Sequence, residues 1–480
     1  MLLKKAMING MMWTSVDKFG VQFIQFIFSI IIARILSPED YGTIGLLTIF
    51  ITISQVFIES GFGKALIQNN KPRQLDYSTV FYFNLLIGVS CYILIFLASP
   101  YIANFFNLPI LKELARIISL VLIINAFNIV PNAIFSIKLH FKPLAISNGV
   151  GAIIGGAIGI IAALNGCGVW ALAYMTLTTS LIIMILQWYQ SKWIPIFNFS
   201  FKSIKKLYKF GGNILVGSLI DSTVNNLNSI AIGKFFDTRS LGFYSKGLGF
   251  SNMLSNTIVS VLYTVLFPAF SIIKDDVERL LLAFKKSIRY ISLIVFPIFM
   301  LVSILAKPLI IILLTEKWLT AAIILQYLVL ARMINMVALV NTQVLHGMGY
   351  SRITLKQDIL KTIVRVLFLF ASFKFGIVWI AIADLVATIV NFFINAYFLG
   401  KILNFGAFRQ IKEFGSVFIS AAIASITSFV LIALFDNNYI KILLAPITLL
   451  IFYLFLLQIF GQKDFIEIKE KLLNKFLKRI

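Results

Sequence analysis

The sequence predicts an all-α polytopic membrane protein with about fourteen transmembrane helices, and three observations support this fold class. First, the 480 residues are 60% hydrophobic and only 13% charged, which is more apolar surface than a soluble chain of this length can bury. Second, the charged residues cluster between long apolar segments. Third, two apolar segments that lie 200 residues apart carry the same kind of polar stripe, which predicts two repeats in one chain.

The apolar segments follow one another with short connections, and most reach or exceed the ~20 residues that a membrane-spanning helix needs. The longer ones are expected to tilt or to project from the bilayer. In chain order, the fourteen segments lie at 11–34, 41–64, 77–99, 113–136, 144–165, 168–190, 207–233, 241–270, 287–314, 318–346, 354–374, 376–400, 413–435 and 440–461.

The distribution of lysine and arginine predicts the orientation, because these residues are enriched in short cytoplasmic loops. With a cytoplasmic N-terminus and alternating sides, the cytoplasmic segment ends carry 29 basic residues and the outer ends carry nine. Both termini are therefore expected in the cytoplasm. The same bias accounts for most of the net charge of +23, so nucleic acid is not expected as a partner.

No cleavable signal peptide, cofactor or metal is expected. Asp17 and Lys18 interrupt the first apolar stretch, and no small-x-small cleavage site follows them. Cys91 and Cys167 lie in or beside membrane segments and are interpreted as packing residues. No spacing of Cys, His and Asp is typical of a metal site, and no glycine-rich lysine motif for a nucleotide occurs.

Two repeats of six helices each are expected, followed by two further helices. Residues 168–173 (Gly-Val-Trp-Ala-Leu-Ala) match 376–381 (Gly-Ile-Val-Trp-Ile-Ala), at the start of segments six and twelve. Because each repeat has an even number of helices, the two repeats are parallel, and the basic loop 191–209 is the expected hinge. The predicted domains are an N-terminal six-helix bundle at 1–200, a C-terminal six-helix bundle at 201–400, two additional transmembrane helices at 401–461 and a cytoplasmic amphipathic tail at 462–480.

Polar stripes on segments one, two, seven and eight predict a hydrophilic path between the two repeats, and hence a transporter. Within each stripe most of the residues are three or four apart, which places them on one face of a helix. Hydrogen bonding between helices and snorkelling at helix ends are the alternative interpretation. The stripes are Thr14, Lys18, Gln22, Gln25 and Ser29; Thr48, Thr52, Gln55 and Glu59; Ser218, Ser222, Asn225 and Ser229; and Ser245, Asn252, Ser255 and Asn256.

Ionisable groups inside a bilayer are costly, so they are expected to face a cavity or a partner. Basic residues in a cavity suit an anionic substrate such as a phosphate or diphosphate. The expected lining of the substrate cavity is Lys18, Gln22, Gln25, Gln55, Asn225, Lys246 and Asn252. The carboxylates expected to couple transport to ions are Asp17, Glu59 and Asp221. Structural pairing and a functional role are both open for the charged second-half residues Arg332, Arg365 and Asp384.

Several short motifs occur in a fixed order along nearly the whole chain. They are Ala33-Arg34-Ile35-Leu36, Gly61-Phe62-Gly63 with Ala65-Leu66-Ile67-Gln68, Val265-Leu266-Phe267-Pro268-Ala269-Phe270 followed by Asp275-Asp276, and Glu316-Lys317-Trp318. In their order and spacing the sequence resembles the bacterial polysaccharide or O-antigen flippases of the multidrug/oligosaccharidyl-lipid/polysaccharide exporter superfamily. It is most similar to the colanic-acid exporter type.

The resemblance implies two six-helix bundles around a central cavity, alternating access, and a location in the bacterial inner membrane. The implied substrate is an undecaprenyl-diphosphate-linked oligosaccharide, exported from the cytoplasmic to the periplasmic leaflet for O-antigen, capsule or exopolysaccharide assembly. Membrane lipids, a polysaccharide polymerase and a chain-length regulator are the other implied partners. Cationic residues line the cavity in related flippases, and Lys18 and Lys246 are the positions here that match this role.

Two other functions are the alternatives to this one. A drug/cation antiporter of the same superfamily should have an acidic cavity without lysines, so Lys18 and Lys246 count against it. A membrane-embedded polysaccharide polymerase or glycosyltransferase usually needs a sizeable outer loop with catalytic groups. The predicted outer loops have only about a dozen residues, too few for a lid or a catalytic subdomain. An enzyme is therefore not expected.

Overall fold

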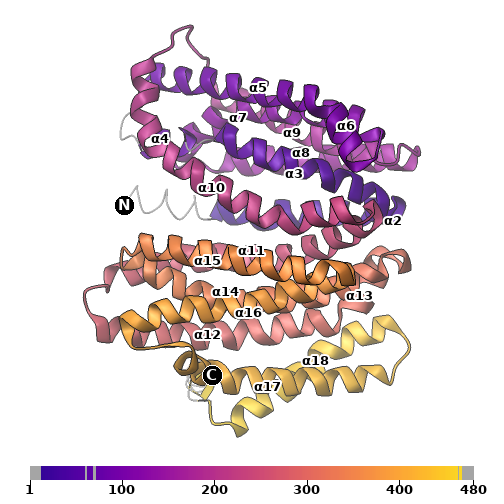
Figure 1. Cartoon of the computed structure of the whole chain (residues 1–480), viewed down its shortest axis with the longest axis vertical. Helices are drawn as coiled ribbons and strands as arrows, with labels where there is room; N and C mark the ends of the chain where they lie inside the picture. Colours follow the sequence, from indigo (N-terminus) through magenta and orange to yellow (C-terminus); the bar gives the residue numbers. More distant parts are fainter. Residues whose placement is uncertain (1–11, 60–61, 69–71, 463, 467–480) are drawn as a thin grey trace, which may run out of the picture. The chain divides into compact units, whose positions relative to one another are not determined.

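A computed structural model describes residues 12–59, 62–68, 72–462 and 464–466 (Figure 1). Almost all of these residues lie in helices, and no strand occurs among them. The predicted all-α fold class is thereby confirmed. Its physical reason is that hydrocarbon offers no partners to backbone N–H and C=O groups, which a helix pairs internally.

The chain forms two compact units, residues 1–245 and 246–480, and the division falls inside the long helix α11 (Thr238–Ile272). The predicted domain boundaries after residues 200, 400 and 461 stay a prediction. The other elements before the division are η1 (Val16–Val21), α2 (Gln22–Ile35), α3 (Pro38–Glu59), α4 (Phe62–Gln68), α5 (Gln74–Phe106), α6 (Ile110–Ile118), α7 (Leu120–Ile137), α8 (Lys142–Leu164), α9 (Trp170–Ser191) and α10 (Phe201–Phe235). Those after it are α12 (Val277–Ile304), α13 (Ala306–Leu314), η2 (Glu316–Trp318), α14 (Leu319–Gly347), α15 (Ser351–Ser372), η3 (Phe373–Phe375), α16 (Ile377–Leu403), α17 (Ala407–Ala433) and α18 (Asn438–Ile459).

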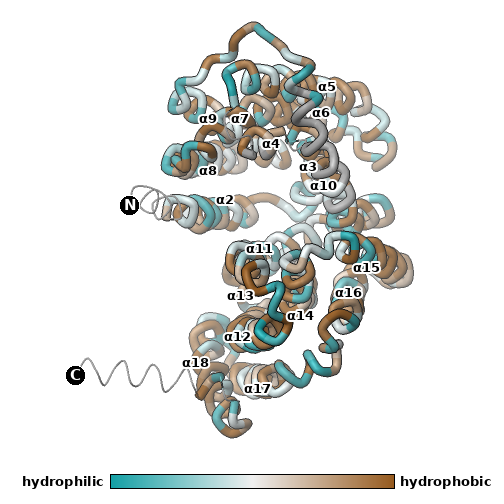
Figure 2. Tube along the Cα trace, turned by 90° about the vertical axis from the view of Figure 1, so that its left-hand side faces the viewer, coloured by the Kyte–Doolittle hydropathy of each residue, from teal (hydrophilic) through white to brown (hydrophobic). Residues whose placement is uncertain are grey.

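Twelve helical stretches of the described residues are long and apolar enough to cross a membrane, so the chain is a multi-pass membrane protein. Hydrophobic residues predominate along these helices in both units (Figure 2). Within the described residues, each of the fourteen predicted segments lies largely in helix, but α10 and α15 are not among the twelve. In α15 the reason is visible, because Arg352, Lys356, Asp358, Lys361 and Arg365 interrupt it. The count of fourteen spans stays a prediction.

In the first unit, α8 and α9 pack closely along a row of three glycines. A Cβ atom on any of them would come too close to atoms of α9, so only glycine permits this approach. Gly159, Gly155 and Gly151 lie in turn against Met175, Thr179 and Ile183. The same antiparallel register, continued by one turn, brings the start of α8 beside the end of α9.

The loop between α9 and α10 is attached to the start of α5. The backbone N–H groups of Ile196 and Ser200 donate to Ser78 Oγ at 2.9 Å and to Thr79 Oγ1 at 3.2 Å. Ser203 Oγ donates to Asp76 Oδ1 at 2.8 Å. This segment is the one for which a hinge was expected, and its role as a hinge stays a prediction.

The second unit is organised around α14, which packs against α12 and α16. Near the start of α17, Glu413 forms ion pairs with Arg289 and Lys285 of α12. Arg289 also pairs with Asp464, beyond α18. These ion pairs fasten the two added helices, α17 and α18, to the remainder of the second unit.

Candidate functional site

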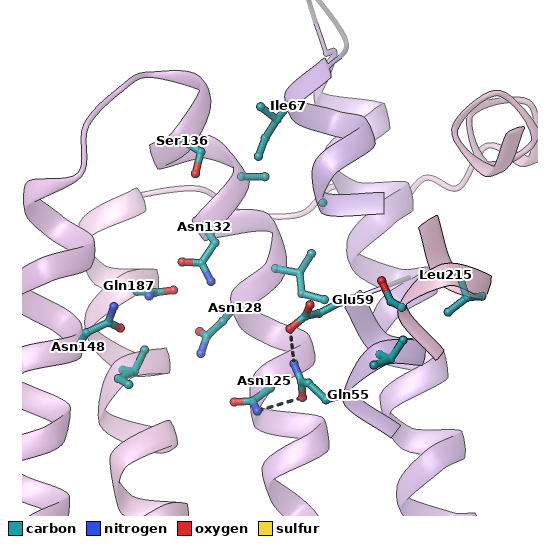
Figure 3. A pocket seen from close by; sticks show the side chains of 16 residues that line it. Gln55, Glu59, Ile67, Asn125, Asn128, Asn132, Ser136, Asn148, Gln187 and Leu215 are labelled. Atoms are coloured by element: carbon teal, nitrogen blue, oxygen red, sulfur yellow. Dashed lines mark hydrogen bonds between the residues drawn. The ribbon is translucent and has the colours of Figure 1, made fainter. Parts of the chain in front are cut away.

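A pocket of about 440 Å³ lies within the first unit, among α3, α4, α7, α8, α9 and α10 (Figure 3). Its size falls within the ~300–1,000 Å³ typical of small-molecule sites. We call it the amide-lined pocket because six carboxamide side chains contribute to its wall. They are Gln55, Asn125, Asn128, Asn132, Asn148 and Gln187.

Helix α7 supplies three of the amides from one face, since Asn125, Asn128 and Asn132 are spaced by three and four. The position of α7 against α9 is set by a proline. Pro131 has no N–H, so the carbonyl of Phe127 lacks its usual helical donor. Trp188 of α9 supplies it instead, and its Nε1 donates to the Phe127 oxygen at 3.0 Å.

The glycine-rich approach of α8 to α9 supplies two further amides. Asn148 lies one turn before Gly151 and Gln187 lies one turn after Ile183, so the register of these helices brings both to the pocket wall. A second hydrogen bond holds this register, from Gln190 Nε2 to Ser147 Oγ at 3.0 Å.

The amides of α3 and α7 form a hydrogen-bonded chain that ends at a carboxylate. Asn125 Nδ2 donates to Gln55 Oε1 at 3.1 Å, and Gln55 Nε2 donates to Glu59 Oε1 at 3.4 Å (Figure 3). Glu59 is the one ionisable group among the described residues that line the pocket. The chain orients the Gln55 amide, because both of its polar atoms have a partner.

Two other amide oxygens of the pocket are buried and have no hydrogen-bond partner, Asn128 Oδ1 and Gln187 Oε1. Their residues are only 6% and 1% exposed. Leaving such an acceptor buried and unpaired costs about 1–3 kcal/mol, a cost that a hydrogen-bond donor at this place would offset.

Asp17 is connected to the pocket through Asn148, whose Nδ2 donates to Asp17 Oδ1 at 2.9 Å. The carboxylate lies in η1, a π-helical turn. Single π-turns in helices are frequent at functional sites, because the extra residue redirects the side chains around it.

The second unit contains a buried lysine. Lys246 in α11 is 6% exposed, and its Nζ lies 5.8 Å from the ring centroid of Trp318. This is the distance of a cation–π interaction. One and a half turns further along α11, Asn252 Oδ1 accepts a hydrogen bond from Arg332 Nε of α14 at 3.2 Å.

Arg365 and Asp384 form an ion pair between α15 and α16, with 3.6 Å between Arg365 Nε and Asp384 Oδ1. The Asp384 side chain is only 3% exposed. The pairing agrees with the structural interpretation of these two residues.

The model of a family described as polysaccharide biosynthesis protein matches residues 31–323. The chain belongs to this family. Among its relatives is the teichuronic acid biosynthesis protein TuaB of Bacillus subtilis (strain 168), 24% identical over 85% of this chain and 86% of the relative. Another is the lipopolysaccharide biosynthesis protein WzxC of Escherichia coli (strain K12), 21% identical over 85% of this chain and 84% of the relative.

Solved structures show that this polysaccharide biosynthesis protein shares its fold with transporters. The lipid II flippase MurJ in an inward closed conformation superimposes with a TM-score of 0.76 at 15% identity, covering 92% of this chain and 98% of the other. An inward-facing multidrug transporter of the MATE family gives a TM-score of 0.60 at 17% identity, covering 82% and 100%. The resemblance to the polysaccharide exporters is confirmed by the family and its relatives.

In this family member, the predicted site residues belong to both units. Gln55 and Glu59 are the two that occur among the described lining of the amide-lined pocket, and Asn252 contacts Arg332 in the second unit. Lys18, Gln25 and Asn225 are exposed, whereas Gln22 is half-buried. The side chain of Asp221 lies outside the described residues. The central cavity between the repeats stays a prediction.

The pocket amides of α7, α8 and α9 were not predicted from the sequence. A signal was present in α7, where Asn125, Asn128, Asn132 and Ser136 form a stripe like that of residues 48–59. Asn148 and Gln187 carry no such signal, because each is a single amide in its helix face and only packing brings it to the pocket.

Proposed function

We infer that this member of the polysaccharide biosynthesis family is a flippase that moves a lipid-linked oligosaccharide repeat unit across the membrane by alternating access. The observation that carries the inference is the amide-lined pocket, whose six carboxamides come from α3, α7, α8 and α9, all of them in candidate membrane spans. The name of WzxC places that relative in lipopolysaccharide biosynthesis, and MurJ, of similar fold, is named a lipid II flippase. The chain acts as a transporter and not as an enzyme.

The chemistry of the substrate explains why such a protein needs polar helices. Sugar hydroxyls and a diphosphate lose their hydration inside a bilayer, and each unpaired hydroxyl costs several kcal/mol, on the order of 4–8, in a purely apolar medium. Amide side chains replace this hydration without adding charge. The buried ammonium of Lys246 suits the diphosphate. Lys18 is the residue of the first unit that we propose for the same role. The isoprenoid tail stays in the lipid.

Several further assignments belong to this proposal. The lipid carrier is undecaprenyl diphosphate, and the membrane is the bacterial inner membrane with both termini in the cytoplasm. A polysaccharide polymerase and a chain-length regulator act next to the flippase in assembly of the surface polysaccharide. Asp17, Glu59 and Asp221 are the candidates for coupling to an ion.

The experiment is a translocation assay with purified protein in liposomes that contain a lipid-diphosphate oligosaccharide. A sugar-modifying enzyme added outside reports how much substrate has reached the outer leaflet, with and without a pH gradient. We expect protein-dependent flipping that falls about tenfold in Lys246→Ala and persists in Lys246→Arg. Lys374→Ala, an exposed lysine of η3, is the control.

The outcomes separate the candidate functions. Full flipping by Lys246→Ala would remove this residue from the diphosphate site. Absence of flipping by folded wild-type protein, over several sugar lipids, would contradict the proposed function. Drug efflux in the same vesicles would then favour the antiporter.

A further inference from the structure

The wall of the amide-lined pocket differs in chemistry from a diphosphate site. Its polar groups are carboxamides and hydroxyls, and neither lysine nor arginine occurs among the described lining residues. Diphosphates are bound by cationic or densely N–H-rich sites. A carboxamide both donates and accepts, which matches a sugar hydroxyl, itself a donor and an acceptor.

Two buried acceptors indicate what the missing partner must offer. Asn128 Oδ1 and Gln187 Oε1 lie in buried side chains of α7 and α9 and have no partner. Both need a donor of an O–H or N–H group, which hydroxyl and acetamido groups of a sugar provide and a diphosphate does not. Both helices are held in place beside these atoms by the Trp188–Phe127 hydrogen bond, so the acceptors are preorganised.

The remaining surface restricts the ligand further. Glu59 is positioned on the wall by the Gln55 amide, and its negative charge disfavours a uronic acid or a phosphorylated sugar at this place. Aliphatic side chains, among them Ile129, Ile183 and Leu215, complete the wall and suit the carbon face of a sugar ring or a methyl substituent. The volume of about 440 Å³ suits one or two sugar rings and not a whole repeat unit.

We propose that the amide-lined pocket of the first unit is a subsite for a neutral sugar of the lipid-linked substrate, an inference that rests on the proposed function. Asn128 and Gln187 accept hydrogen bonds from its hydroxyl or acetamido groups, and Glu59 excludes acidic sugars. The subsite makes flipping depend on the identity of the sugar, separately from recognition of the diphosphate.

The test uses three probes in the same liposomes: undecaprenyl diphosphate without sugar, its N-acetylglucosamine derivative and its glucuronic acid derivative. Wild-type protein should flip the neutral sugar lipid faster than the other two. Gln187→Leu and Asn128→Leu should lower the ratio of neutral-sugar to sugar-free flipping rates about tenfold, which corresponds to a loss of about 1.4 kcal/mol of binding free energy. Glu59→Gln should raise flipping of the glucuronic acid derivative.

Gln343→Leu is the matched control, because Gln343 is also a fully buried amide without a partner but lies in α14 of the second unit. It should leave the preference unchanged. Equilibrium binding of the three probes in detergent gives a second measurement, with Gln187→Asn as a milder variant if Gln187→Leu fails to fold.

Each result decides between the two claims. If wild-type protein flips none of the probes, the proposed function fails. If it flips them and folded Gln187→Leu and Asn128→Leu keep the wild-type preference, the sugar subsite alone is overturned. A preference lost equally in Gln343→Leu would also overturn it, since the effect would then come from buried amides in general.

Discussion

Asn341 of α14 and Gln410 of α17 exchange two hydrogen bonds in the interior of the second unit. Asn341 Nδ2 donates to Gln410 Oε1 at 3.1 Å, and Gln410 Nε2 donates to Asn341 Oδ1 at 2.8 Å. Both residues are fully buried. Because α17 begins the two-helix extension, this reciprocal pair fixes where the extension attaches to the second unit.

We expect Gln410→Leu to lower the stability of the protein by about 1–3 kcal/mol, because it leaves the buried Asn341 amide without its partner. Thermal unfolding of the purified protein in detergent measures this. The double variant Asn341→Leu/Gln410→Leu should recover part of the loss, since the unpaired Asn341 amide is then removed, and only the Phe405 carbonyl still lacks the hydrogen bond from Gln410 Nε2. Losses that simply add up would contradict the pairing.

We expect Gly242→Ala to destabilise the protein and reduce flipping. A Cβ atom at Gly242 would overlap the backbone carbonyl of Pro38, and the equivalent Gly42 lies as closely against the carbonyl of Thr238. The matched control is Gly249→Ala in the same helix, where nothing lies within 4 Å of the new atom. The control should gain up to about 1 kcal/mol from helix propensity. Equal stability of both variants would disprove the close contact.

We expect Arg365→Ala to be more damaging than Asp384→Asn. Removing the arginine leaves a buried carboxylate without its counterion, which typically costs about 3–5 kcal/mol, whereas the amide introduced by Asp384→Asn carries no charge. Unfolding temperatures of both single variants and of Arg365→Ala/Asp384→Asn form a double-mutant cycle. A double variant no better than Arg365→Ala would argue against the ion pair as the cause.

Asp237 gives a pH-dependent contribution to stability at the start of α11. Its Oδ1 accepts a hydrogen bond from the Ser240 backbone N–H at 2.7 Å. A hydrogen bond from the Ser240 side chain, foremost, lowers the pKa of Asp237 below its ordinary value of 3.8. A lowered pKa stabilises the folded state above pH 3.8, and the gain is lost as the pH falls through the lowered pKa.

Asp237→Asn should therefore be less stable than wild type at neutral pH, and the difference should shrink as the pH falls below 3.8. Unfolding temperatures measured across this range compare the two proteins. A difference that is constant with pH would show that the charge of Asp237 contributes nothing.

Glu59→Gln should make flipping insensitive to a pH gradient if Glu59 carries the coupling proton, because glutamine cannot be protonated in this range. Asp17→Asn tests the second carboxylate near the pocket in the same assay. Flipping rates with and without the gradient are the measurement. A gradient response that persists in both variants would transfer the coupling role to Asp221 or to no carboxylate at all.

The sequence predicted the helices well because each is determined locally. A long apolar segment must pair its own backbone in a membrane, so length and hydropathy suffice to locate most such helices, as the twelve candidate spans among the described residues show. Spacing along a helix also identified a polar face, such as that of Gln55 and Glu59. The same reasoning applied to residues 125–136 would have indicated the asparagines of α7.

What the sequence alone determined is therefore the all-α membrane fold class and the polar face of single helices. The tertiary structure decided which faces meet. Arg365 finds Asp384, Asn148 finds Asp17 across 131 residues, and Gln187 joins Asn128 in one pocket. The physical reason is that helical periodicity determines on which face of its own helix a side chain lies. The residue it meets depends on contacts between different helices, such as the glycine contacts of α8 with α9 and the hydrogen bond from Trp188 to the Phe127 carbonyl.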